Sequence, residues 1–124
     1  MNLENNRHTG ELPSEFGRLS LLTSLNGASN ALTGSLPSEL FSLSLLEVLN
    51  LNSNRLNGTI SRNAGNLTSL NELRLSRNIL TGTIPSEFVQ LTNLRECFVL
   101  CDCCLSCSFA KVLMLVLQGY CGSI

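Results

Sequence analysis

The residues best able to carry chemistry in this chain are six cysteines that all lie between positions 97 and 121. They are Cys97, Cys101, Cys103, Cys104, Cys107 and Cys121. Thiols at such short spacing can form disulfides, bind zinc as thiolates, or pack as small apolar side chains. The most compact zinc set would include Cys103 and Cys104, but adjacent residues of an extended chain point to opposite faces. The residues alone leave all three interpretations open.

Other catalytic groups are scarce. His8, Lys111 and Asp102 are the only histidine, lysine and aspartate of the chain, and His8 lies far along the sequence from the cysteines. The segment Cys104-Leu105-Ser106-Cys107 is a C-x-x-C pair without the surrounding βαβ pattern of a redox domain. No glycine-rich phosphate-binding motif occurs. We therefore predict no enzyme activity, no cofactor and no metal ion.

The composition indicates a repeat protein rather than a charged binding domain. Charged residues make up 14% of the 124 residues, and the formal net charge is −1. Nucleic-acid binding is therefore not expected, because it requires a basic surface. Leucine accounts for 27 residues and asparagine for 14. Such an excess of two residue types is typical of internal repeats.

The sequence repeats with a period of 24 residues. Asparagines mark this period at Asn6, Asn30, Asn54 and Asn78. Leucine and glycine return at other fixed offsets, as in Leu22, Leu46, Leu70 and Leu94 or in Gly10, Gly34, Gly58 and Gly82. Four units at one spacing indicate a solenoid, in which each unit buries the apolar edge of its neighbour.

Each unit combines a strand pattern with a turn pattern. Alternating apolar positions before each asparagine predict short parallel strands near residues 24–27, 48–51, 72–75 and 96–99. The asparagine amide can satisfy backbone groups that the next turn leaves unpaired, so stacked units would form an asparagine ladder. On the opposite side, the segments 14–16, 38–40, 66–70 and 88–91 suit a 3₁₀ or helical turn.

These motifs resemble the plant-type leucine-rich repeat, whose consensus is LxxLxLxxNxLxGxIPxxLxxLxx, over residues 1 to about 104. The chain is similar to short leucine-rich repeat proteins of plants and diatoms, or to a fragment of a receptor ectodomain. The resemblance implies an α/β solenoid, a right-handed superhelix with short parallel concave strands and a 3₁₀ or irregular convex side. His8, Gly27, Ser61 and Ala64 depart from the consensus. We expect looser packing at these positions without loss of the fold.

The repeat frame divides the chain into two parts. Residues 1–104 hold four units and a partial fifth, and residues 97–124 form a Cys-rich C-terminal cap with an apolar tail. The frame places Cys97 and Cys104 at inward positions of the fifth unit. The cluster also resembles Cys-rich tails that close similar leucine-rich repeat proteins, and this favours disulfides. The apolar run 112–117 is shorter than the roughly 20 residues of a membrane span, so we expect it to cover the solenoid end.

The N-terminal segment begins within a repeat. Residues 1–6 have neither the basic and apolar regions of a signal peptide nor a polar capping segment. They would leave the first strand as an open edge. We therefore expect a truncated chain or a fragment of a longer ectodomain.

Polar side chains flank the strand leucines. In leucine-rich repeat proteins such concave positions usually carry binding specificity, and the corresponding residues here are Asn26, Glu47, Asn50, Asn52, Asn71, Glu72, Arg74, Arg77, Arg95 and Phe98. This surface suits hydrogen bonds to a protein, peptide or glycan ligand, although ordinary solvated strands have a similar composition. Phe98 is the one aromatic anchor expected on it.

The resemblance implies non-catalytic recognition or signalling, outside the cell or at its surface, by a monomer or by part of a longer chain. One alternative is an incomplete structural fragment of a receptor or receptor-kinase ectodomain. A thiol redox or zinc-binding protein, and a cytoplasmic location, are less favoured. The sequons Asn57-Gly58-Thr59 and Asn66-Leu67-Thr68 are glycosylation candidates if the chain enters the secretory route.

Overall fold

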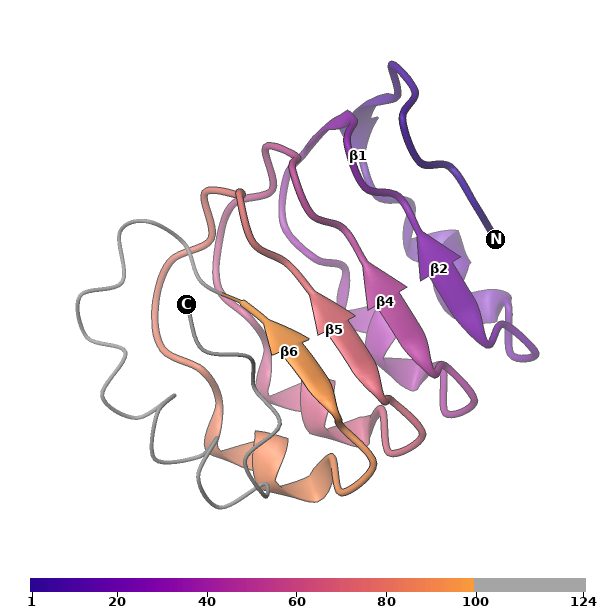
Figure 1. The fold of residues 1–124 in the computed structure, drawn as a ribbon, viewed down its shortest axis with the longest axis vertical. Helices are drawn as coiled ribbons and strands as arrows, with labels where there is room; N and C mark the ends of the chain where they lie inside the picture. Colours follow the sequence, from indigo (N-terminus) through magenta and orange to yellow (C-terminus); the bar gives the residue numbers. More distant parts are fainter. Residues whose placement is uncertain (100–124) are drawn as a thin grey trace.

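The computed structural model describes residues 1–99, which wind into a stack of similar turns (Figure 1). Each turn contributes short strands and one 3₁₀ helix. The strands are β1 (Thr9–Glu11), β2 (Ser24–Asn26), β3 (Ala31–Thr33), β4 (Val48–Asn50), β5 (Glu72–Arg74) and β6 (Glu96–Phe98). The 3₁₀ helices are η1 (Ser14–Arg18), η2 (Ser38–Ser42), η3 (Arg62–Asn66) and η4 (Ser86–Gln90). The predicted leucine-rich-repeat solenoid is confirmed.

The main sheet is parallel, in the order β2-β4-β5-β6. Its register is shifted by one repeat at every pairing, so Leu25 lies opposite Leu49, Leu49 opposite Leu73, and Leu73 opposite Cys97. These central residues are buried, whereas their strand neighbours are more exposed. The strands begin where the sequence predicts them and end one residue earlier. A single buried position in each three-residue strand explains this shortness, because burial of that side chain anchors the strand.

A second, smaller sheet was not predicted from the sequence. Strand β1 pairs with β3 in parallel, and an isolated parallel bridge joins Thr59 to Thr81 further along the stack. These segments follow the asparagine of each unit, where no alternation of apolar and polar residues runs long enough to indicate a strand. Their pairing instead results from stacking, because each segment lies beside its copy in the next repeat.

The 3₁₀ helices begin directly after an extended residue. Proline fills this position in three units, and in the third unit Ser61 adopts the same extended conformation (φ −64°). The Ser61 side chain accepts a hydrogen bond from the backbone N–H of Asn63 at 3.2 Å. Serine therefore replaces proline here as a helix cap. The third helix lies at Arg62–Asn66, so the prediction of a turn at residues 66–70 was four residues late.

The asparagines at the 24-residue spacing tie neighbouring repeats together. The Nδ2 group of Asn54 donates to the carbonyls of Leu51, Asn52 and, one repeat earlier, Gly27. Its Oδ1 accepts a bond from the N–H of Leu32. Asn78 and Asn30 make the equivalent bonds. Asn6 bonds only to carbonyls of its own unit, because no earlier repeat is described beside it.

The departures from the repeat consensus are accommodated in different ways. His8 is exposed rather than inward, because the first unit lies at the end of the described stack. Gly27 is buried, and a Cβ built on it would lie 3.1 Å from the Leu51 side chain, so Leu51 already fills the space. Ala64 is buried beside a small apolar cavity that Phe41 and Phe88 also line. Gly27 therefore leaves no unfilled space, whereas a small cavity adjoins Ala64.

Residues 1–5 run along the outer edge of β2. The carbonyl of Met1 accepts a bond from the N–H of Asn26, and the N–H of Leu3 donates back to the carbonyl of Asn26. The segment is itself the outermost strand position, whose open edge was expected, and its one strand bridge within residues 1–99 is that between Asn2 and Asn26 of β2. At the other end, Cys97 is buried opposite Leu73, whereas residues 100–124 of the predicted cap lie outside the described residues. Among residues 1–99 no helix has the length and apolar character needed to cross a membrane.

Candidate functional site

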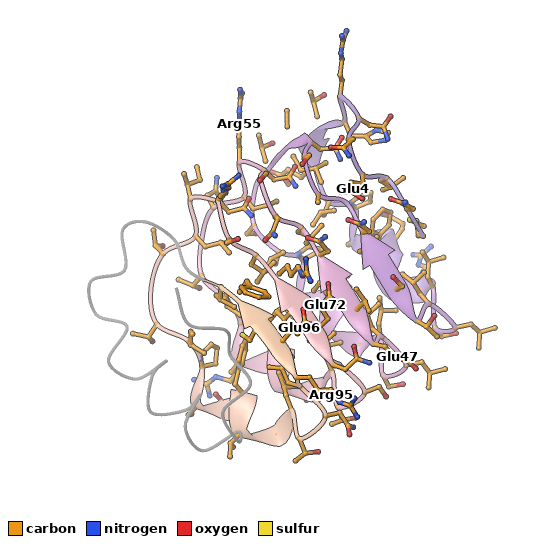
Figure 2. The ribbon with its side chains drawn as sticks, in the orientation of Figure 1. Glu4, Glu47, Arg55, Glu72, Arg95 and Glu96 are labelled. Carbon is orange, nitrogen blue, oxygen red and sulfur yellow. The ribbon has the colours of Figure 1, made fainter. Side chains whose placement is uncertain are left out.

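The outward side chains of β2, β4, β5 and β6, together with the residues just before and after these strands, form one continuous surface, here called the strand face. Glu72 and Glu96 lie on the neighbouring strands β5 and β6, towards one end of this face, and Glu47 and Arg95 lie just before strands β4 and β6 (Figure 2). Arg55 extends from the opposite rim of the stack. The strand face corresponds to the concave side expected from the sequence.

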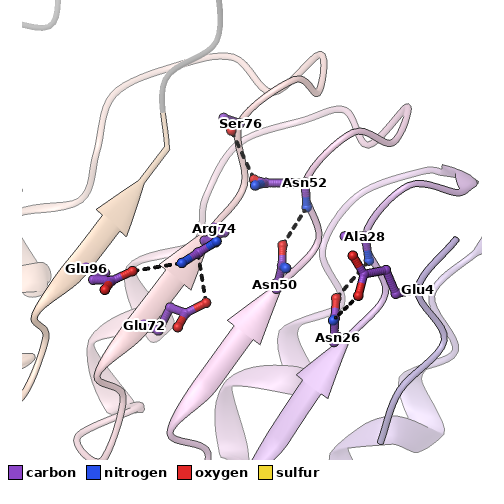
Figure 3. Close-up of polar contacts among 9 residues, drawn as sticks. All are labelled: Glu4, Asn26, Ala28, Asn50, Asn52, Glu72, Arg74, Ser76 and Glu96. Atoms are coloured by element: carbon purple, nitrogen blue, oxygen red, sulfur yellow. Dashed lines mark hydrogen bonds and ion pairs between the residues drawn. The ribbon is translucent and has the colours of Figure 1, made fainter. Parts of the chain in front are cut away.

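Arg74 is the centre of a charged cluster on the strand face. Its Nη2 donates to Oε2 of Glu96 at 2.8 Å, and its Nε lies 2.8 Å from Oε1 of Glu72 (Figure 3). The Nε contact is an ion pair without the alignment of a hydrogen bond. The guanidinium carbon also lies 5.4 Å from the centre of the Phe98 ring, within cation–π range. The side chain is thus held in one orientation by groups on two strands.

Beside this cluster, asparagines cap the backbone at the ends of the strands. Oδ1 of Asn26 accepts a bond from the N–H of Ala28, and Oδ1 of Asn50 accepts one from the N–H of Asn52, each at 3.2 Å (Figure 3). Asn2 makes the same contact with the N–H of Glu4 at 3.0 Å. This side-chain-to-backbone bond spans two residues and fixes the amide orientation.

The capping pattern stops at β5, because Arg74 occupies the position of the asparagine. The equivalent backbone donor is the N–H of Ser76, and it has no acceptor among residues 1–99. The Ser76 hydroxyl instead donates to Oδ1 of Asn52 at 3.0 Å. An available backbone donor therefore lies next to the Arg74 cluster.

The structure brings together some of the predicted binding residues and leaves others apart. Asn50, Arg74 and Phe98 are direct neighbours across three strands. The residues before the strands, namely Glu47, Asn71 and Arg95, are linked through their backbones but make no side-chain ion pair within residues 1–99. Arg77 is exposed beyond the end of β5, in a left-handed conformation (φ 54°).

Glu4 joins the strand face although it was absent from the predicted binding residues. Its Oε2 accepts a bond from Nδ2 of Asn26 at 2.8 Å. The 24-residue frame places Glu4 in the same column as Asn52 and Ser76, so the signal was present in the sequence. The hydrogen bond between Asn26 and Glu4 depends on how residues 1–5 pair with β2, and this pairing cannot be predicted from the 24-residue period.

Cys97 is the one predicted disulfide candidate inside the described residues. Burial raises the pKa of its thiol from 9.0 to about 12. The thiol therefore stays protonated at neutral pH and is a weak nucleophile and metal ligand. No group of three or more His, Cys, Asp or Glu side chains suited to a metal ion occurs in residues 1–99. The candidates Cys101, Cys103, Cys104, Cys107 and Cys121 lie outside the described residues.

Both glycosylation candidates are exposed. Asn57 precedes the left-handed Gly58, and Asn66 ends η3. Neither side chain is used in a hydrogen bond within the described part of the chain, so both amides are accessible. Their glycosylation remains a prediction.

Comparison with known families gives one match. The sequence profile of the family described as Leucine Rich Repeat matches residues 1–19, 45–67 and 69–91, which together make up just over half of the chain. No match was found among curated protein sequences.

Solved structures similar to the chain include ectodomains of receptor kinases from Arabidopsis thaliana. The GASSHO1/SCHENGEN3 ectodomain, in complex with CASPARIAN STRIP INTEGRITY FACTOR 2, is 42% identical over 75% of this chain, with a TM-score of 0.74. HAESA, in complex with the peptide hormone IDA and the co-receptor SERK1, is 36% identical over 78% of this chain, with a TM-score of 0.76. The SOBIR1 ectodomain is 33% identical over 77% of this chain, with a TM-score of 0.74. The matches span 11%, 16% and 52% of those chains, respectively.

Proposed function

Because the chain belongs to the leucine-rich repeat family, we propose that its strand face binds a peptide or protein ligand, outside the cell or at its surface, without catalysis. Similar ectodomains are in complex with peptide hormones, and this supports a peptide as the ligand class. The exposed sequons Asn57 and Asn66 agree with passage through the secretory route.

One observation carries the proposal. Arg74 is held in place by Glu72, Glu96 and Phe98, and this cluster adjoins polar side chains of β4. Fixed side chains lose little conformational entropy when a ligand binds, so a preorganised surface favours recognition. Arginine is among the residue types that most often dominate binding energies, and phenylalanine is enriched at interfaces.

The test is selection from a phage-displayed library of random peptides on the 124-residue protein. We expect Arg74→Ala and Phe98→Ala to weaken binding of selected peptides by about tenfold or more, or about 1.4 kcal/mol. Arg62→Ala is the matched control, because Arg62 is an exposed arginine of η3, away from the strand face. Equal loss in all three variants, or no selected peptide, would contradict the proposal. Binding to a glycan array by a protein that selects no peptide would assign the face to glycans instead.

A second candidate is that the chain acts as part of a longer ectodomain. The matches span only 11%, 16% and 52% of the similar receptor structures, so those chains contain long stretches that have no counterpart here. In that case the 124-residue chain would select no peptides, while a longer product of the same gene would. A direct comparison of the two proteins in the same selection distinguishes the candidates.

A further inference from the structure

The asparagines of the strand face expose only one end of their amide groups. In Asn26 and Asn50 the Oδ1 atom accepts a backbone N–H from two residues later. A backbone N–H can only donate, so the oxygen must face it and the NH₂ group must point away. The backbone therefore decides that these amides present hydrogen-bond donors to a ligand.

Two of these donors are available on β4 and just after it. The Nδ2 of Asn50 has no acceptor among residues 1–99. Asn52 uses its Oδ1 to accept from the Ser76 hydroxyl, and its Nδ2 has no acceptor in the same range. The Nδ2 of Asn26, in contrast, is already bound to Glu4. The donors thus gather next to β5 rather than along the whole face.

The N–H of Ser76 adds a third donor. In the two preceding repeats the equivalent N–H groups of Ala28 and Asn52 are capped by asparagine, but Arg74 at the corresponding position cannot accept a hydrogen bond. A strip of three donors therefore runs from β4 to β5, formed by Asn50, Asn52 and Ser76.

The charges around this strip give an anionic ligand no net attraction. Arg74 lies beside the strip with the carboxylates of Glu72 and Glu96 against it, and these three groups carry one net negative charge at neutral pH. The exposed Arg77, which follows Ser76, brings the sum to zero. A carboxylate or phosphate therefore gains no net charge attraction here, whereas an uncharged oxygen acceptor can use the donors without any ion pairing. The strip suits neutral carbonyl oxygens.

Building on the proposed function, we propose that the donor strip of Asn50, Asn52 and Ser76 binds main-chain carbonyl oxygens of an extended, internal segment of a peptide. Such a segment presents neutral carbonyls and has no terminal carboxylate. Recognition at the strip then depends on the backbone of the ligand, and side-chain specificity comes from Arg74, Phe98 and the remaining strand face.

Asn50→Asp tests this inference with almost no change in shape. The aspartate still accepts the N–H of Asn52, but it presents an oxygen to the ligand where asparagine presents NH₂. Using peptides selected from the random library on the wild-type protein, we expect at least about tenfold weaker binding with an unchanged melting temperature. Asn63→Asp on η3 adds the same charge on an exposed residue outside the strand face, and it should bind like wild type. The loss should persist at high salt, where a purely electrostatic effect would be screened.

The peptides provide an independent readout. Replacing single main-chain amides by thioamides weakens the carbonyl as an acceptor, and at least one internal position should lose affinity for wild type but not for Asn50→Asp. Wild-type affinity in Asn50→Asp, or equal loss from a thioamide in both proteins, would overturn this inference while leaving peptide binding established. Failure to select any peptide would overturn the proposed function and this inference together.

Discussion

At the scale of single residues, the ability of the strand face to hydrogen-bond a ligand depends on which backbone N–H groups already have an acceptor within the protein. Asn50 caps the N–H of Asn52, whereas Arg74 offers no acceptor and the N–H of Ser76 has none within the described residues 1–99. One substitution between repeats thus converts a satisfied structural group into a group that a ligand can use. The fourth unit therefore differs from the third in its hydrogen bonding, next to the ion pairs of Arg74.

Amide hydrogen exchange measures this difference directly. After correction for intrinsic rates, we expect the N–H of Ser76 to exchange roughly five- to tenfold faster than that of Asn52, corresponding to about 1 kcal/mol for one hydrogen bond. Arg74→Asn restores the acceptor and should slow exchange at Ser76 without affecting Asn52. Equal rates at the two positions in the wild-type protein would contradict the structure of the donor strip.

The buried Cys97 thiol makes the free energy of unfolding depend on pH. Its pKa is raised by burial from 9.0 to about 12, so the folded state favours the neutral thiol. The stabilising contribution is fully present below the unfolded pKa of 9.0 and is lost as the pH rises from there towards the folded pKa.

Under reducing conditions, we therefore expect the free energy of unfolding of the wild-type protein to fall faster with alkaline pH than that of Cys97→Ala. The stability of the wild type relative to Cys97→Ala should decrease by about 1.4 kcal/mol per pH unit above pH ~9 and be constant below it. Urea unfolding of both proteins on either side of that pH provides the measurement. Parallel pH profiles would show that Cys97 is not buried as a thiol.

At the scale of elements, glycines set the distance between neighbouring 3₁₀ helices. A Cβ built on Gly65 of η3 would lie 2.7 Å from the carbonyl oxygen of Glu87 in η4. Gly17 of η1 approaches the carbonyl oxygen of Glu39 in η2 in the same way. Between these two close pairs, the buried Phe41 of η2 holds the same frame position as Gly17 and Gly65. Small and large side chains therefore alternate along the row of helices.

Gly65→Ala should separate η3 from η4 and destabilise the protein by about 1–3 kcal/mol, because the new methyl group meets backbone atoms that cannot rotate away. Asn63→Ala in the same helix is the control. Its side chain is exposed, and the change should stay within about 0.5 kcal/mol. Equal effects of Gly65→Ala and Asn63→Ala on the denaturation midpoint would show that η3 and η4 accommodate the added methyl group without separating.

At the scale of the whole molecule, stability arises from contacts between adjacent repeats. The strands pair one repeat apart, and the asparagine ladder bonds each unit to its neighbour. Such a stack behaves as a nearly one-dimensional array, in which each repeat depends mainly on the units beside it. A change in chain length that keeps the 24-residue period should therefore disturb folding less than a change that breaks the period.

Deletion of residues 22–45, one full period, should therefore leave a folded protein with a lower melting temperature. The deletion joins Leu21 to Leu46, which takes the place of Leu22 in the frame. Deletion of residues 22–33, half a period, should lower the melting temperature further although it removes less of the chain, because it breaks the stacking frame. Circular dichroism during heating compares the two. A cooperative transition in the shorter deletion alone would contradict the array description.

Repeat spacing by itself determined the solenoid, the positions of the four main strands and the inward direction of Leu25, Leu49, Leu73 and Cys97. These features follow from the side chains that must be buried at each turn, and those side chains recur every 24 residues in the sequence. The Cys-rich cap and the glycosylation of Asn57 and Asn66 remain predictions.

Only the tertiary structure decided the contacts that cross from one repeat to the next. The pairing of β1 with β3, the bond from Asn26 to Glu4 and the filling of the space beside Gly27 by Leu51 all depend on how far apart the stacked units lie. The open N–H of Ser76 depends on the same stacking, because its orientation is set by the strand pairs around it. A periodic sequence specifies each unit, but the distances and hydrogen-bond partners between units are fixed when all the repeats pack together.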